Sequence, residues 1–255
     1  MNISKETKFL IWVAKQASKL IDVQVEVSQK NGLDLVTEND LKLEKFISAE
    51  MRKKFPDFTI IGEEFSNDAD KTLNYFVIDP IDGTINYAMG LEVWGIQIGC
   101  VKNGEPFASV IMLPATNELY FAEKDKGAYK NGKRINVCIG EPKGKIVVSN
   151  ILRNAEDWAF LEQVMPDEKE RFLYSRKLFS DAYTSAKLAE GAIGTFYSFN
   201  FKTNIWDGLP GEILITEAGG HCHCDESFKI ATAFECEKDR ILNLFKKWST
   251  KKDGK

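Results

Sequence analysis

The stretch of this 255-residue sequence with the clearest chemical potential is Asp79-Pro80-Ile81-Asp82-Gly83-Thr84, which follows directly on the apolar run Phe76-Val77-Ile78. In open α/β sheets, ligand sites lie just beyond the carboxyl ends of strands. Two carboxylates three residues apart, in a turn fixed by Pro80 and loosened by Gly83, can converge on a cation. The carbonyl of Ile81 is a further hard oxygen ligand. Gly83 and Thr84 add backbone N–H groups where a helix is expected to start, which favours an anion such as phosphate.

Two other acidic positions could join this site from distant parts of the chain. Glu63-Glu64 follows the predicted strand Ile60-Ile61-Gly62, and Asp207 follows Trp206 at the predicted start of a helix. Each has an ordinary alternative, because charge pairs at strand ends are usually solvated and aspartate is a common helix N-cap. Gathered together, the four carboxylates would need a counter-ion, and an all-oxygen set of ligands suits Mg²⁺.

Four segments of the sequence resemble the inositol monophosphatase family, in that family's order and spacing: residues 34–40, 62–64, 79–87 and 206–220. The resemblance implies an α/β fold, a layered αβαβα sandwich with a mixed, partly antiparallel sheet. It implies one domain over residues 1–255, with an N-terminal half of about 1–144, a C-terminal half of about 145–250 and the active site between them. It also implies Mg²⁺-dependent hydrolysis of a small phosphate monoester, lithium sensitivity and a homodimer.

The resemblance carries roles over position by position. Glu63, Asp79 and the carbonyl of Ile81 would hold a first metal ion, Asp79, Asp82 and Asp207 a second, and a third, looser ion would lean on Glu63. Thr84 would orient the attacking water with Asp40 as its partner, and Glu64 is not expected to be a direct ligand. The implied cofactor is Mg²⁺, as two or three ions, with Mn²⁺ as a substitute and Li⁺ and Ca²⁺ as inhibitors.

The substrate is implied to contact six positions: Asp82, Gly83, Thr84, Asp181, Asn200 and Asp207. Two of them depart from the family pattern. Asn200 stands where inositol-specific members carry a glutamate, and Asp181 stands where a small residue usually follows Ser180. Charge and size there decide which alcohol fits, so strict inositol specificity is in doubt. Fructose 1,6-bisphosphate, histidinol phosphate, NADP(H) and 3′-phosphoadenosine 5′-phosphate stay open as alternatives. Asp181 could also be an ordinary acid at a helix N-terminus.

The elements that must position these residues follow from hydrophobic periodicity and turn signals. Ser4 is expected to cap a first helix, and Thr37 opens a second, with Asp40 in a capping-box position. Helices are also predicted over 155–164, 180–190, 207–218 and 236–248. Strands are predicted over 58–61, 75–78, 94–101, 106–112, 119–123, 145–149, 171–174, 195–199, 221–224 and 229–232. The lysine-rich end, residues 246–255, is expected to be frayed.

Three other functions compete with that of a phosphatase that uses metal-activated water. A phosphatase with an aspartyl nucleophile needs its first acid at position 80, which is Pro80. A zinc site at His221-Cys222-His223-Cys224 lacks a second ligand cluster, so plain strand residues are favoured. A regulatory role beside the RNA machinery gains no support from a net charge of −4 and an expected pI near 5.5.

Composition sets the remaining expectations. Hydrophobic residues make up 44% and charged residues 28%, which is typical of a globular protein. The sequence shows no apolar run long enough to span a membrane and no signal-peptide pattern, and its five cysteines are expected to be reduced. We therefore expect a cytoplasmic enzyme whose partner is a small phosphorylated metabolite, with no membrane and no nucleic acid.

Overall fold

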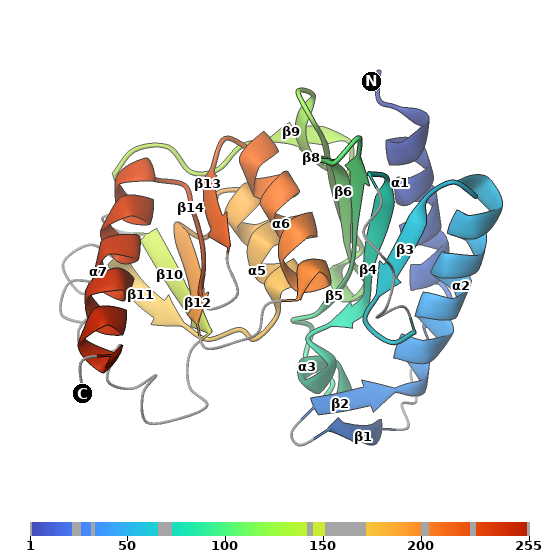
Figure 1. Ribbon diagram of the computed structural model, residues 1–255, viewed down its shortest axis with the longest axis horizontal. Coiled ribbons are helices and arrows are strands. Elements are labelled where there is room, and N and C mark those ends of the chain that lie inside the picture. Colours follow the sequence, from blue (N-terminus) through green and yellow to red (C-terminus); the bar gives the residue numbers. More distant parts are fainter. Residues whose placement is uncertain are drawn as a thin grey trace.

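The protein is built of five layers that alternate between helices and sheets (Figure 1). The computed structural model describes residues 2–21, 27–31, 34–65, 73–141, 145–150, 172–199, 204–224 and 228–253. Helices α1 (Lys5–Ser18) and α2 (Glu38–Lys54) form the first layer, and α5 (Asp181–Ala189) and α6 (Ile205–Glu217) form the central one. Helix α7 (Glu235–Asp253) forms the last layer. The αβαβα sandwich expected from the sequence is confirmed.

The seven-stranded sheet lies between the first helical layer and the central one. Its order is β3-β4-β5-β6-β7-β8-β9. Only the β3–β4 pair is parallel, and every other neighbouring pair is antiparallel. The strands are β3 (Thr59–Gly62), β4 (Tyr75–Asp82), β5 (Gly95–Lys102), β6 (Glu105–Leu113), β7 (Glu118–Glu123), β8 (Gly127–Lys130) and β9 (Lys133–Ile135), with the 3-10 turn η1 (Pro114–Thr116) between β6 and β7.

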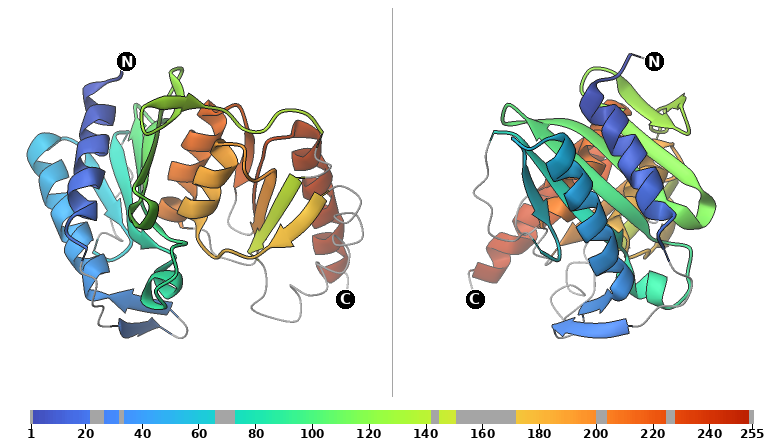
Figure 2. Two further views of the ribbon diagram at one scale, coloured as in Figure 1. Left: turned by 180° about the vertical axis from the view of Figure 1, so that it is seen from behind. Right: turned by 90° about the vertical axis from the view of Figure 1, so that its right-hand side faces the viewer.

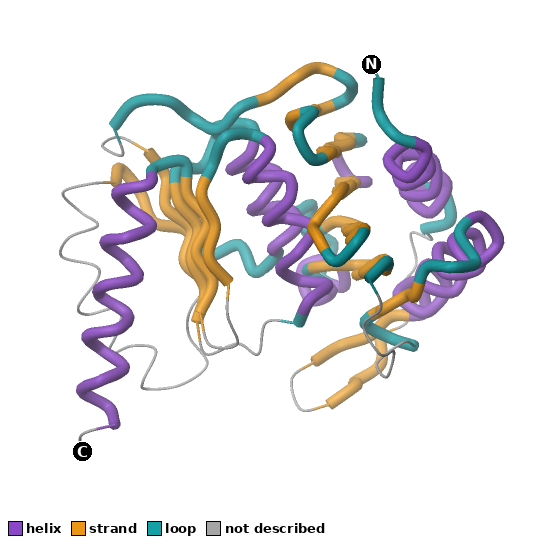
Figure 3. Tube along the Cα trace, turned by 45° about the horizontal axis from the view of Figure 1, so that its top comes forward, coloured by secondary structure: helices purple, strands orange, loops and turns teal. Residues whose placement is uncertain are grey.

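The five-stranded sheet lies between the central helices and α7, as the tube of Figure 3 shows. Its order is β11-β10-β12-β14-β13, and β10 is parallel to both of its neighbours. The strands are β10 (Lys145–Asn150), β11 (Phe172–Arg176), β12 (Thr195–Phe199), β13 (His221–Cys224) and β14 (Phe228–Thr232). A separate hairpin of β1 (Val27–Asn31) and β2 (Asp34–Thr37) contacts the short helix α3 (Thr84–Ala88).

The hydrophobic core is divided by the seven-stranded sheet. Helices α1 and α2 lie side by side on one face of that sheet (Figure 2), where Leu10, Leu43 and Phe76 are fully buried. On the other face α5 and α6 pack closely, because a Cβ on Gly211 would lie only 2.3 Å from the hydroxyl of Ser185. This close approach brings the N-terminal ends of α5 and α6 near the end of β4.

Local signals in the sequence explain where several helices begin. The hydroxyl of Ser4 accepts the N–H of Thr7 at 3.1 Å, and the carboxylate of Asp40 accepts the N–H of Thr37 at 2.8 Å. Both caps were predicted and are confirmed. Among the described residues, no helix has both the length and the apolar character that crossing a membrane requires.

Several element boundaries were predicted wrongly. Strand β4 continues past Pro80 to Asp82, helix α6 begins two residues before Asp207, and α7 runs to Asp253 where a frayed end was expected. The helix predicted over 155–164 lies outside the described residues. The first sheet is formed by residues before 144 and the second by residues after it. The assignment of one domain with its active site between two halves stays a prediction.

Candidate active site

Asp79 lies on β4 and is almost completely buried, with 2% of its surface exposed. The side-chain amide of Gln97 donates to its Oδ2 at 3.2 Å, while its Oδ1 is buried and has no hydrogen-bond partner among the residues that the structure describes. Burial, followed by the charges of Glu63, Asp82 and Asp207, raises the pKa of Asp79 well above its ordinary value. A buried carboxylate oxygen without a donor is costly, so this atom lacks a positive partner.

Asp82 is the last residue of β4, and its Oδ2 accepts hydrogen bonds from two residues at the start of α5. The hydroxyl of Ser180 donates to this oxygen, and the N–H of Ala182 donates to it at 2.8 Å. Burial and the nearby charge of Asp181 raise the pKa of Asp82 to about 6, although these hydrogen bonds act the other way.

An irregularity in β4 explains why Asp79 and Asp82 act together. Side chains alternate across a regular strand, so residues three apart would point to opposite faces. Here Asp79 pairs with Gln97 and Asp82 pairs with Gly95, so two residues of β4 oppose one of β5. Such a bulge re-aims the following side chain, and Pro80 within it has no N–H to leave unpaired.

The turn after β4 is shaped by Gly83. Its φ of 86° is in the left-handed region, and a Cβ there would lie 3.0 Å from the carbonyl oxygen of Val93. The hydroxyl of Thr84 donates to the carbonyl of Ile81 at 2.9 Å. The carbonyl of Ile81 keeps a second lone pair, so a metal could still use it. An anion at Gly83 and Thr84 stays a prediction.

Glu63 follows β3, the parallel neighbour of β4, and its N–H donates to the carbonyl of Ile78 at 3.2 Å. The turn that carries it is fixed by the buried Glu44, which the sequence analysis missed. Glu44 accepts the N–H groups of Glu64 at 2.7 Å and Phe65 at 3.0 Å. A Cβ on Gly62 would lie 2.1 Å from a carboxylate oxygen of Glu44, so a larger residue there would displace the carboxylate that holds the turn.

Asp207 lies in the central helical layer. It is the third residue of α6, and its Oδ2 accepts the N–H of Asn204 at 3.1 Å in a capping box. The alternative that Asp207 is itself the N-cap is therefore wrong, because Asn204 takes that place. Burial, then the charges of Asp181 and Asp82, raises the pKa of Asp207 to about 7.

The four carboxylates fit a cation. Each of Asp79, Asp82 and Asp207 has a raised pKa, partly through the charge of neighbouring carboxylates, and Asp79 offers an unpartnered oxygen. In the described ranges, no three carboxylate, imidazole or thiolate side chains already form a metal-binding group. A bound ion would therefore have to draw the carboxylates closer together.

The structure gives Asp40 and Thr84 other partners than each other. Asp40 accepts from the N–H and, at 2.5 Å, the hydroxyl of Thr37, while Thr84 donates to Ile81. Burial raises the pKa of Asp40 to about 6, against the lowering effect of its bonds to Thr37. Their joint action on a water stays a prediction.

Of the two positions expected to select the substrate, Asp181 lies among the described residues and Asn200 does not. Asp181 is the first residue of α5, and its Oδ2 accepts from the ammonium of Lys229 at 2.9 Å. Asn200 lies outside the described residues. Roles for both in substrate binding stay predictions.

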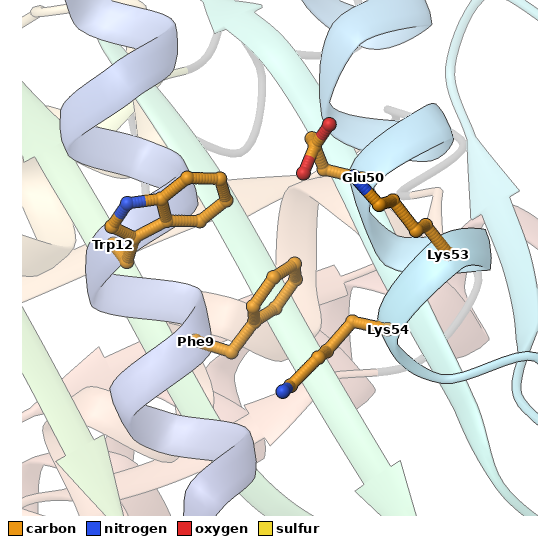
Figure 4. A pocket seen from close by; sticks show the side chains of 5 residues that line it. All are labelled: Phe9, Trp12, Glu50, Lys53 and Lys54. Atoms are coloured by element: carbon orange, nitrogen blue, oxygen red, sulfur yellow. The ribbon is translucent and has the colours of Figure 1, made fainter.

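A surface hollow of about 300 Å³ lies elsewhere, between α1 and α2. Figure 4 shows the rings of Phe9 and Trp12 facing Glu50, Lys53 and Lys54 across it. It offers one carboxylate and no cluster of metal ligands, so it is a poor candidate for phosphate chemistry.

The remaining cysteines and histidines form no rival site. The residues His221–Cys224 form β13, as expected for plain strand residues. All five cysteines are thiols outside any disulfide, and the part of the chain described here contains no group of three potential zinc ligands.

Comparison with known proteins agrees with the geometry of the site. The model of the inositol monophosphatase family matches residues 3–242. The chain belongs to the inositol monophosphatase family. It is therefore a hydrolase of phosphate monoesters, as the motifs predicted.

Relatives within the inositol monophosphatase family carry different names. A fructose-1,6-bisphosphatase/inositol-1-monophosphatase of Thermotoga maritima is 36% identical over 82% of this chain and 78% of the relative. A Nus factor SuhB of Xylella fastidiosa is 32% identical over 82% of this chain and 74% of the relative. The solved structure of a Thermotoga maritima IMPase covers 97% of this chain and 99% of its own, with 28% identity and a TM-score of 0.84.

Ser180 provides a first test of how the family's site is held in this chain. Its hydroxyl donates to Asp82 and accepts the N–H of Tyr183 at 3.1 Å as the cap of α5. We expect Ser180→Ala to lose roughly 1 kcal/mol of unfolding free energy with the cap, and about tenfold or more of kcat/KM because Asp82 loses a donor. Thermal melts and steady-state kinetics measure the two effects.

The matched control is Ser4→Ala, which removes the equivalent cap of α1 far from the carboxylates. It should lose similar stability and keep its activity. Equal activity in the two variants would show that Ser180 acts only as a helix cap.

Proposed function

We propose that this chain hydrolyses small phosphate monoesters with a water activated by Mg²⁺, and that no phosphate becomes covalently bound to the protein. The observation that carries the proposal is a group of four acidic residues, three of which have raised pKa values, together with an oxygen of Asp79 that has no hydrogen-bond partner in the described part of the chain. A divalent cation would favour the fully ionised form of such a group at neutral pH.

The proposed metal ligands are those implied by the motifs. Glu63, Asp79 and the Ile81 carbonyl would hold one ion, and Asp79, Asp82 and Asp207 a second. A third ion would lean on Glu63. When bound, Mg²⁺ lowers the pKa of a water and stabilises the charge of the phosphoryl group in transit.

The chain's own residues provide positioning for this reaction. Gln97 donates to one carboxylate oxygen of Asp79, and Ser180 donates to one carboxylate oxygen of Asp82. Each hydrogen bond fixes the direction of the other oxygen of the same aspartate. Thr84 is proposed to orient the attacking water, with Asp40 in support, once its hydroxyl turns from the Ile81 carbonyl. Placement of water and phosphate in line provides much of the rate, since phosphoryl transfer needs little beyond positioning and charge.

The proposed substrates are sugar phosphates of more than one kind. The first Thermotoga maritima relative is named both for fructose 1,6-bisphosphate and for inositol 1-phosphate. In this chain Asn200 replaces the glutamate expected of inositol-specific members, and Asp181 adds a charge beside the site. We therefore propose that inositol phosphate is not the preferred substrate.

A panel of phosphate monoesters assayed with Mg²⁺, with and without Li⁺, tests this proposal. We expect turnover of several sugar phosphates, dependence on Mg²⁺ or Mn²⁺, and inhibition by Li⁺ and Ca²⁺. Strong preference for inositol phosphate would refute the specificity argument. A trapped phosphoenzyme would refute the proposed water attack.

A role beside the RNA machinery is the second candidate, because one relative is named a Nus factor. The net charge of −4 does not favour nucleic acid as a partner. Asp82→Asn separates the two functions, since phosphatase activity should collapse while a scaffolding role should survive. We also propose a cytoplasmic location and a homodimer. Sedimentation would test whether the protein is a homodimer.

A further inference from the structure

Lys229 is a buried cation in contact with Asp207, one of the proposed metal ligands. It lies on β14 with 3% of its surface exposed. Its ammonium donates to the carboxylate of Asp181 at 2.9 Å and to the backbone carbonyl of Asp207 at 3.0 Å. It thereby joins the second sheet to the first residue of α5 and to the start of α6. No local sequence motif points to Lys229.

The surroundings of Lys229 keep it charged. Burial alone would lower the pKa of its ammonium, but the charge of Asp181 and the hydrogen bond to it outweigh this and raise the pKa above its ordinary value. The ammonium also lies 5.3 Å from the centre of the Phe196 ring. A buried ammonium is costly unless it is paired in this way.

The two members of the pair act on the site with opposite signs. Asp181 places a negative charge close to Asp82 and Asp207, while the ammonium of Lys229 places a positive charge against the backbone of Asp207. Together they add no net charge, but each alone would change the field felt by a divalent ion. Such interactions are strong where water is excluded.

We infer that Lys229 and Asp181 form a positioning pair that sets the affinity of the carboxylate site for divalent metal, through the backbone and charge of Asp207. This inference rests on the proposed function, because it assumes that the carboxylates bind metal. It assigns Asp181 to the tuning of metal affinity in addition to any contact with substrate.

A double-variant cycle measured by Mn²⁺ binding tests the pair. In Asp181→Asn, an unpaired ammonium faces Asp207, so the Kd for Mn²⁺ should rise by roughly tenfold or more. In Lys229→Met, an extra carboxylate is freed beside Asp82 and Asp207, so the Kd should fall. The double variant should return to within about threefold of the wild-type Kd, because the pair has no net charge.

Isothermal titration of the metal-free protein gives these constants without relying on catalysis, and circular dichroism confirms that each variant is folded. A purely structural pair would weaken binding in both single variants. That result, or unchanged affinity in Asp181→Asn, would overturn the inference. If Lys229→Met does not fold, Asp181→Asn and the double variant still decide, since only charge tuning predicts recovery of affinity in the double variant.

The outcome also separates this inference from the proposed function. If the wild-type protein binds no Mn²⁺, the proposed metal site itself is wrong. If the wild-type protein binds Mn²⁺ and the variants match it, only the tuning role of the pair is wrong.

Discussion

Replacement of Asp79 by asparagine is expected to reduce kcat/KM by about a thousandfold or more, while it makes the metal-free protein more stable near neutral pH. If Asp79 is a shared ligand as proposed, its removal costs the several kcal/mol that bound metal contributes to the transition state. The same change removes a buried charge that lies against Glu63, Asp82 and Asp207 and keeps a group that can accept from Gln97. Steady-state kinetics and thermal melts in a chelator measure the two effects.

The matched control for this prediction is Asp125→Asn. Asp125 is exposed in the turn between β7 and β8, with a φ of 63° that asparagine tolerates. It should leave both activity and melting temperature unchanged. A metal-free Asp79→Asn protein that melts below the wild type would contradict the view that the carboxylates repel one another.

The second large effect is the opposite pH dependence of the metal-free and metal-bound proteins. The pKa values of Asp40 and Asp82 are raised to about 6 and that of Asp207 to about 7. Because these values lie above those of the unfolded chain, the folded state binds more protons between about pH 4 and pH 7. The stability that these groups contribute is complete below about pH 4 and is lost as the pH rises through about 6 to 7.

The strongly lowered pKa of Glu118 does not obscure this range. Although burial acts the other way, hydrogen bonds from Lys130 and Lys187 lower the pKa of Glu118 to about 2. Its contribution is present above the unfolded pKa of about 4.5 and is lost only as the pH falls toward about 2. Between about pH 5 and pH 7.5, the raised groups therefore dominate the slope among these residues.

Thermal melts at about pH 5 and about pH 7.5 measure the effect. In a chelator, the melting temperature should fall by several degrees toward the higher pH, and with saturating Mg²⁺ it should rise, because metal binds the ionised form. Asp207→Asn should flatten both trends. A metal-free protein that is more stable at the higher pH would count against the cluster.

The local structure of individual parts of the candidate site could be predicted from short stretches of the sequence. The string from Asp79 to Thr84 combines two carboxylates, a proline and a glycine that fit a strand end and a tight turn, and both features are present. The cap at Thr37 was predictable for the same reason, since it depends on residues three apart. Gln97 was detectable in principle, as a polar residue in the middle of an apolar strand.

Contacts between distant segments were not available from such patterns. The turn at Asp79 was expected to end the strand at Pro80, but pairing with β5 continues β4 to Asp82 and inserts a bulge. Glu44 holds the turn of Glu64 from a helix 20 residues away, and Ser180 holds Asp82 from 98 residues away. Neither role has a short-range signature.

The sequence by itself determined which acidic residues are candidate ligands, their attachment to strand ends and helix starts, and the family. These properties depend on backbone preferences within a few residues and on the chemistry of carboxylates. Only the tertiary structure decided that Asp79 and Asp82 share a face, that Asp207 is the third residue of its helix and not the cap, and that Lys229 stands behind it. Those outcomes arise from strand pairing, close packing of α5 on α6, and burial of charge, which act between residues far apart in the chain.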